Sequence, residues 1–181
     1  MQLLKNIILS IVSPRVGWEE INTAGIKPDD VLSHAYFPLL GVLALTTFVP
    51  MIYDSTLTLM GQLMMAICLF VSYFVAYYIG IYLLGGLYPE LVKTQGASDR
   101  LSDYVVYCLI FLVIMDIIKN LLPIDLTLVI FVKLFMFWMA YRGMEYLRLD
   151  DGKRTRFLIF SSLLIFFTPT LIAKCFSLFI P

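Results

Sequence analysis

Long runs of apolar residues alternate with short polar connections along most of this chain. A helix needs roughly 20 mostly apolar residues to cross the hydrocarbon core of a bilayer. Five such windows are present, at 33–52, 59–84, 104–122, 126–146 and 157–179. Backbone groups inside lipid must be hydrogen-bonded within their own segment, so continuous runs favour helices over the alternating strands of a barrel. The pattern predicts an all-α membrane protein, a five-helix transmembrane bundle.

The segment 1–32 has a different pattern and precedes the transmembrane domain 33–181. Its apolar residues recur at helical spacing while polar residues occupy the other face, which predicts a short N-terminal amphipathic helix in the membrane interface. Ser13 and Pro14 then read as the cap and first turn of a second short helix. The expected interfacial anchors are Leu4, Ile7, Ile8, Ile11 and Trp18. Packing of the same stripe on the protein's own helices is the alternative, because both uses need the same amphipathic face.

Composition supports a membrane location. Apolar residues make up 61% of the chain, charged residues only 14%, and the mean hydropathy is +0.91. So little polar surface cannot cover a soluble globule, and the lipid bilayer is therefore an expected partner. The 13 basic and 13 acidic side chains cancel, so no net field recruits nucleic acid.

The positions of lysine and arginine predict an orientation, because basic flanks resist translocation. With the N-terminus in the cytoplasm, the inner segments hold Lys5, Arg15, Lys27, Lys93, Arg100, Arg142, Arg148, Lys153, Arg154 and Arg156. Only Lys119 and Lys174 fall near the outer side. We therefore expect a protein of the cytoplasmic (inner) membrane with the N-terminus inside and the C-terminus outside.

The stretch 142–156, which covers the end of the fourth window and the connection to the fifth, is rich in basic residues. These are Arg142, Arg148, Lys153, Arg154 and Arg156. They are suited to attract anionic lipid headgroups or an acidic membrane-protein partner. A role in fixing orientation alone is the alternative.

Two charges lie away from the ends of the third and fourth windows, at Asp116 and Lys133. Both are about eight residues from the turn centred between Ile124 and Asp125, so an antiparallel hairpin places them at one depth, roughly 10 Å or more below its end. An unpaired charge deep in a span costs on the order of 2.5 to 3.5 kcal/mol, so we expect an intramembrane ion pair. Pairing of Asp116 with Lys119 on its own helix is the alternative.

Other patterns indicate packing rather than chemistry. Ser72, Ala76 and Gly80 repeat every four residues, a spacing that lets helix backbones approach closely, within the bundle or in an oligomer. No Gly-rich phosphate loop, HExxH or GxSxG motif is present, and His34 is the single histidine. Each cysteine sits in an apolar run without a partner at ligand spacing. We expect no enzyme activity, cofactor or metal.

Several stretches together resemble the Yip family of Ypt/Rab-interacting proteins. They are SPRVGWEEI, YFPLLG at the start of the first window, GGLYPELVKTQGASDRLSDYVVYCL and WMAYRGMEYLRLDDGKRTRFLI. The resemblance covers nearly the whole chain and is closest to a compact, prokaryotic type. Eukaryotic members usually have a long cytoplasmic tail and an Asp-Leu-Tyr-Gly-Pro-like motif, where this chain has HAYFPLLG. Small-GTPase binding is therefore not expected.

Two functions fit these features. The first is a non-catalytic membrane scaffold or adaptor that organises lipid or protein partners through its N-terminal segment and basic inner loop. The second is a small transporter or ion-conducting oligomer that uses Asp116 and Lys133.

Overall fold

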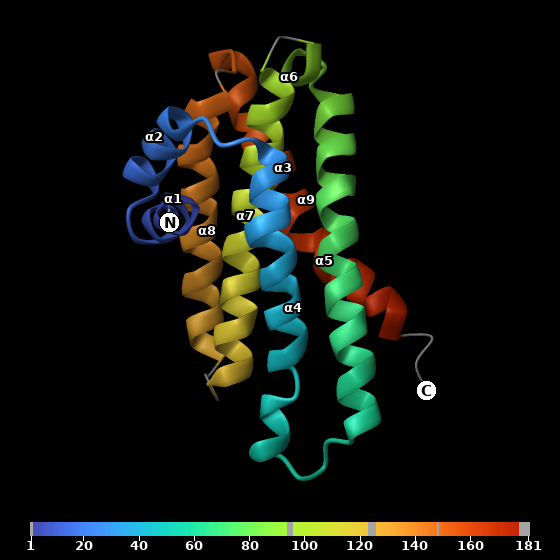
Figure 1. Cartoon of the computed structure of the whole chain (residues 1–181). Helices are drawn as coiled ribbons and strands as arrows, with labels where there is room; N and C mark the ends of the chain where they lie inside the picture. The colour runs from blue at the N-terminus through green and yellow to red at the C-terminus, as the bar shows by residue number, and fades with distance from the viewer. Residues whose placement is uncertain (1, 94–95, 123–125, 148, 178–181) are drawn as a thin grey trace.

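The computed structural model is helical throughout the residues that it describes (Figure 1). These residues are 2–93, 96–122, 126–147 and 149–177, with side chains described for all of them except 93, 126–133, 151 and 177. The helices, in chain order, are α1 (Gln2–Val12), α2 (Pro14–Ala24), α3 (Pro28–Val31), α4 (Phe37–Thr46), α5 (Leu59–Leu87), α6 (Glu90–Lys93), α7 (Ala97–Leu121), α8 (Leu126–Leu147) and α9 (Asp151–Ser177). A π-helical turn, Leu32–Tyr36, joins α3 to α4, and a 3-10 turn, Val49–Ile52, follows α4. The all-α prediction is confirmed.

Four helical segments in the described residues are long and apolar enough to cross a membrane. They are Pro28–Ile52, Leu59–Leu87, Ala97–Leu121 and Gly152–Phe176. Each overlaps one window expected from the sequence. The window 126–146 coincides with α8, but the side chains of 126–133 lie outside the description, so a fifth span stays a prediction.

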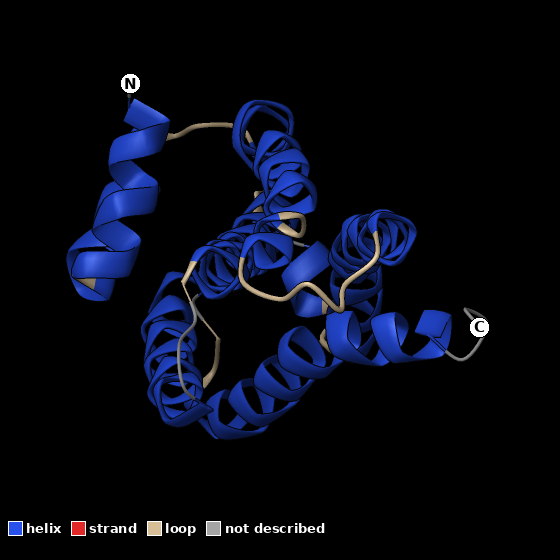
Figure 2. Ribbon diagram, turned by 90° about the horizontal axis from the view of Figure 1, so that it is seen from below, coloured by secondary structure: helices blue, strands red, loops and turns tan. Residues whose placement is uncertain are grey.

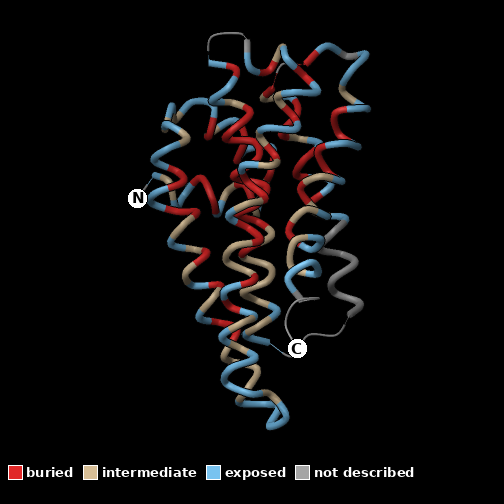
Figure 3. The backbone as a smooth tube through the Cα atoms, turned by 90° about the vertical axis from the view of Figure 1, so that its right-hand side faces the viewer, coloured by how far each residue is buried: buried red, intermediate tan, exposed pale blue. Residues whose placement is uncertain are grey.

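Helix α7 is the centre of the bundle. Every residue of 101–111 is buried, and α7 contacts α4, α5, α8 and α9. The weak amphipathic character of this segment is typical both of a helix that other helices surround and of a helix that crosses a membrane. Buried residues lie mainly in the half of the bundle that carries α6, whereas the opposite end is largely exposed (Figure 3).

Helices α1 and α2 form a hairpin on one side of the bundle. Figure 1 shows α1 almost end-on and Figure 2 shows it lengthwise, so α1 lies across the direction of the long helices. A Cβ atom at Gly17 would lie 2.4 Å from the Cα of Ser10, so only glycine allows this close crossing. Pro14 occupies the first turn of α2, as expected, although Ser13 makes no side-chain cap hydrogen bond.

The connections expected on the inner side gather at one end of the bundle. Helix α6 and the connection from α8 to α9 lie at the top of Figure 1, and the connection from α4 to α5 lies at the bottom. The ammonium of Lys153 binds the Glu90 carboxylate at 2.7 Å, which ties the start of α9 to α6. These basic connections therefore share one end of the bundle, and the orientation of that end stays a prediction.

The repeat of small residues on α5 is buried. Ser72 and Ala76 are almost fully covered, and a Cβ atom at Gly80 would meet Val105 of α7 at 3.1 Å. At Gly80 the repeat therefore allows a close approach within the bundle.

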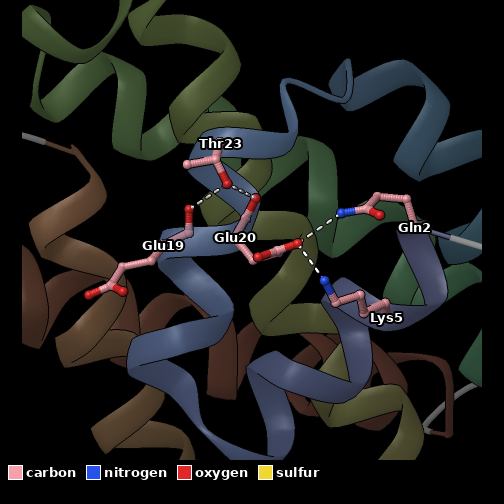
Figure 4. Close-up of polar contacts among 5 residues, drawn as sticks. All are labelled: Gln2, Lys5, Glu19, Glu20 and Thr23. Carbon is pink, nitrogen blue, oxygen red and sulfur yellow. Dashed lines mark hydrogen bonds and ion pairs between the residues drawn. The ribbon is translucent and has the colours of Figure 1, made fainter.

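Two polar contacts join α1 to α2 (Figure 4). The Glu20 carboxylate accepts hydrogen bonds from Lys5 Nζ at 2.7 Å and from Gln2 Nε2 at 2.9 Å. The bond from Lys5, followed by the bond from Gln2, lowers the pKa of Glu20 from its usual value of 4.5. The ionised form of Glu20 is thus favoured in the folded hairpin.

A carboxyl group whose pKa is lower in the folded state stabilises the fold at pH values above its unfolded-state pKa. This stabilisation is lost as the pH falls through the folded-state pKa. We therefore expect Glu20→Gln to lower the melting temperature at pH 7 by a small amount relative to the unchanged protein. This difference should shrink as the pH falls below 4.5. Thermal melts of both proteins from pH 3 to 7 provide the test, and a difference that does not change with pH would contradict it.

Candidate functional site

Trp18 attaches the N-terminal hairpin to the bundle. Its side chain is buried, stacks on Tyr104 at 5.9 Å between ring centroids, and lies 5.7 Å from the ring of Tyr146. The indole Nε1 donates a hydrogen bond to the backbone carbonyl of Met139 at 3.1 Å. Both the apolar ring and the polar N–H are therefore satisfied inside the protein.

A glycine on α8 makes room for this indole. A Cβ atom at Gly143 would lie 2.7 Å from Cζ2 of Trp18 and 2.8 Å from Cδ2 of Tyr104. Real side chains do not approach so closely, so Gly143 forms the recess into which Trp18 fits. The glycine within WMAYRGMEYL thus has a physical role that the sequence alone did not reveal.

Polar groups surround this recess. Asp103 is 4% exposed and accepts a hydrogen bond from the Tyr146 hydroxyl at 3.0 Å. Asn6 of α1 is fully buried, and its amide approaches the Tyr107 hydroxyl without full hydrogen-bond geometry. A buried polar group without a good partner is costly. The surface between α1 and α7 is therefore not a plain apolar contact.

A small cleft opens between α2 and α8 beside Trp18. Its volume is about 140 Å³, below the usual range for a small-molecule site. Its lining residues are Arg15, Trp18, Glu19, Asn22, Arg142, Glu145 and Tyr146. Arg15 pairs with Glu19 at 3.6 Å and Arg142 pairs with Glu145 at 3.3 Å, so the charges of these two pairs are balanced.

A second polar group of residues crosses the bundle within the membrane spans. The Tyr36 hydroxyl donates to the backbone carbonyl of Tyr73 at 2.7 Å, and the Tyr73 hydroxyl donates to Asp116 Oδ2 at 2.6 Å. Nearer the far end, Asn120 Nδ2 donates to Thr46 Oγ1 at 3.2 Å. These contacts join the first, second and third spans.

The structure gives Asp116 a partner that the sequence argument missed. The side chain of Lys133 lies outside the described residues, so its pairing with Asp116 stays a prediction. No ion pair between Asp116 and Lys119 occurs among the described contacts. The sequence did contain a signal for this contact, because Tyr73 lies in the middle of an apolar span and its hydroxyl needs an acceptor there.

The expected interfacial anchors separate into two groups. Leu4 is 65% exposed and Ile8 is 52% exposed, whereas Ile7 and Trp18 are buried in the protein. Ile11 is partly buried. For Ile7 and Trp18 the structure favours the alternative, packing on the protein's own helices. Leu4 and Ile8 keep the exposure that contact with lipid requires.

The basic residues of the inner connection are held by local contacts. Arg142 and Lys153 are paired with Glu145 and Glu90, and Arg154 Nε donates to the backbone carbonyl of Leu149 at 3.1 Å. Arg156 is exposed, and Arg148 lies outside the described residues. In the part of the chain that the structure describes, no three His, Cys, Asp or Glu side chains gather to hold a metal ion.

The apolar helices and their buried polar contacts define an integral membrane protein of the helical, multi-span class. A model of the Yip1 domain family matches residues 8–173, so the chain belongs to this family and the resemblance seen in its sequence is confirmed. Members of the family are generally non-catalytic membrane proteins. No curated protein and no solved structure matches the chain.

Gly143→Ala should weaken the attachment of the hairpin, because the added methyl group overlaps the rings of Trp18 and Tyr104. Overpacking of this kind costs about 1–3 kcal/mol, partly offset by the gain of up to about 1 kcal/mol when alanine replaces glycine in a helix. We expect faster tryptic cleavage at Lys27, which follows α2. The control is Gly41→Ala, where the new Cβ meets nothing within 4 Å. Equal cleavage rates in the two variants would contradict the role of Gly143.

Tyr73→Phe should destabilise the bundle by about 1–3 kcal/mol, because the partly buried Asp116 loses its donor. In a double-mutant cycle with Asp116→Asn, the two changes should be less costly together than their sum. Unfolding in detergent measures each free energy. Tyr82→Phe is the control, since Tyr82 lies on the same helix and is 80% exposed. Strict additivity of Tyr73→Phe and Asp116→Asn would show that the hydrogen bond does not couple the two residues.

Proposed function

We propose that this protein is a non-catalytic membrane adaptor that holds its α1–α2 hairpin at the inner membrane surface and presents it to lipid and to a protein partner. The observation that carries the proposal is the position of Trp18. Its indole fixes the hairpin to α7 and α8 from within, while α1 lies across the bundle (Figure 1). An element held in this way is suited to presenting a surface rather than to entering the bilayer.

The position of the hairpin along α7 supports a location at the membrane–water interface. Asn6 and Trp18 contact Tyr107 and Tyr104, near the point where the charged start of α7 gives way to apolar residues. Asp99, before this point, is exposed. A helix that lies across the bundle here runs along the boundary between headgroups and hydrocarbon.

The outer face of α1 is suited to lipid contact. Leu4, Ile8 and Val12 are 65%, 52% and 75% exposed and follow one another at intervals of four residues. This spacing places them on one face of the helix, and together they form the exposed stripe. In water an exposed row of this kind is unfavourable, whereas at a bilayer its burial is stabilising. The exposed stripe therefore supports an interfacial position for α1.

The charged side of the hairpin and the neighbouring connections supply the surface for a protein partner. Arg15, Glu19 and Glu145 line the small cleft beside Trp18, and Arg156 is exposed on the same end of the bundle. Opposite charges in a fixed arrangement favour one partner over others more than they raise affinity. Affinity capture from native membranes, with a search that includes small GTPases, identifies this partner.

A transporter or ion-conducting oligomer is the second candidate function. The observation in its favour is Asp116, an ionisable group within a span that binds the Tyr73 hydroxyl. Proton or ion flux into vesicles that contain the purified protein separates the two functions. Flux that Asp116→Asn abolishes, in a protein that remains folded, would support transport and count against the adaptor.

Replacing Leu4 and Ile8 together by Asp should remove α1 from the bilayer surface without preventing insertion of the spans. A charged group on the buried face of an interfacial helix costs more than the lost apolar contact alone. With Cys175→Ser as background, a dye attached to Val12→Cys should be quenched by brominated lipid, and the two aspartates should reduce this quenching. Partner recovery should fall in parallel.

The control for this experiment is Thr23→Asp with Ser33→Asp. Both positions are exposed, and they add the same charge away from the exposed stripe and from the lining of the small cleft. The proposal is wrong if the control reduces quenching as much as the change at Leu4 and Ile8 does. It is also wrong if neither pair of changes alters quenching.

A further inference from the structure

We propose that a groove between α8 and α9 binds one anionic phospholipid, with the phosphate at its inner mouth and an acyl chain along its length. The groove consists of two hollows that share Phe137. The inner hollow has a volume of about 470 Å³ and the deeper one about 420 Å³. This site shares Glu145 with the small cleft beside Trp18 but none of its other lining residues, and the proposal does not depend on the role of the hairpin.

The groove exists because α8 and α9 do not pack along their whole length. Helix α9 starts beside α8 and then runs toward α5, against which it makes its more extensive contact (Figure 2). The side chains between the diverging helices are left uncovered. Leu134, Phe137, Ile159, Leu163 and Phe167 are each between 44% and 64% exposed.

The polarity of the groove changes from one end to the other. Its inner mouth includes Tyr141, Glu145, Arg154 and Thr155. Its deeper part is lined by Leu134, Phe137, Ile159, Ser162, Leu163, Phe166 and Phe167, and is apolar apart from the Ser162 hydroxyl. A phospholipid has the same order of polarity, with a charged headgroup followed by ester groups and hydrocarbon.

The length of the groove suits one leaflet. On α9 it extends from Arg154 to Phe167, which corresponds to about 20 Å at roughly 1.5 Å per residue. The hydrocarbon of one leaflet is about 15 Å deep, half of a core of about 30 Å. An acyl chain that enters beside Arg154 therefore reaches the end of the groove near the bilayer midplane.

The charge at the mouth favours an anionic headgroup. Arg154 lines the mouth and its Nε donates to the Leu149 carbonyl, which holds the guanidinium there. The negative charge of Glu145 is opposed by Arg142 at 3.3 Å. Arginine is well suited to phosphate because its planar fork makes paired hydrogen bonds. The hydroxyls of Tyr141 and Thr155 add donors at the same end.

The test uses the purified full chain in mixed micelles with phosphatidylglycerol or with phosphatidylcholine of the same acyl chains. Native mass spectrometry counts the lipids retained on the protein. We expect one retained lipid, with about fivefold preference for phosphatidylglycerol, the factor that one basic residue supplies at a membrane surface. Arg154→Gln should remove most of this preference while a lipid is still retained.

Leu163→Trp should fill the groove and reduce retention of both lipids. The matched control is Phe160→Trp, because Phe160 is similarly exposed on α9 but does not line the groove. Arg15→Gln is the charge control and should leave the preference unchanged. Equal retention of the two lipids by the unchanged protein would overturn the proposal. So would a Leu163→Trp protein that retains lipid as Phe160→Trp does, since the lipid would then be bound elsewhere on the surface.

Discussion

Lipid offers no hydrogen bonds, so the polar groups of the central helix α7 depend on partners from the helices around it. Tyrosines supply most of these partners. Tyr146 of α8 bonds Asp103, Tyr77 of α5 bonds Ser102, Tyr73 of α5 bonds Asp116, and Tyr104 of α7 itself bonds Ser161 of α9. Each bond lies at the end of a large apolar ring, so one side chain provides both packing and a polar contact. The order of the helices around α7 is thus fixed by these hydrogen-bonded pairs of side chains as well as by packing.

The sequence was sufficient for the elements whose pattern has one physical meaning. Apolar runs of the required length predicted the long helices, and Pro14 predicted the start of α2. It was not sufficient where one pattern serves two environments. The stripe of α1 is equally suited to lipid and to protein, so only the structure shows that Ile7 faces inward and Ile8 faces outward.

Partners distant in the chain were also beyond sequence reasoning. The argument for Asp116 considered charged groups on the same or the next helix, whereas Tyr73 lies on the preceding span, 43 residues away. Gly143 is a similar case. A glycine in a helix is a weak signal by itself, and its purpose becomes visible only when the indole of Trp18 from the N-terminal segment occupies the space above it. Residues of this kind acquire their role from packing that no local pattern records.

The relative size of two effects explains how the hairpin is held. Lys5, Gln2 and Glu20 are at the surface, where hydrogen-bonded charges compete with water and contribute little to stability. Trp18 instead removes a large ring from solvent, for which about 1.5–3 kcal/mol is typical, and keeps its N–H bonded to Met139. Burial of the indole therefore attaches the hairpin to the bundle, while the close crossing at Gly17 holds α1 on α2 and the Glu20 contacts lie at its surface. In the part of the chain that the structure describes, Leu4, Ile8 and Val12 remain exposed on the outer face of α1, which is the face that the proposed membrane contact uses.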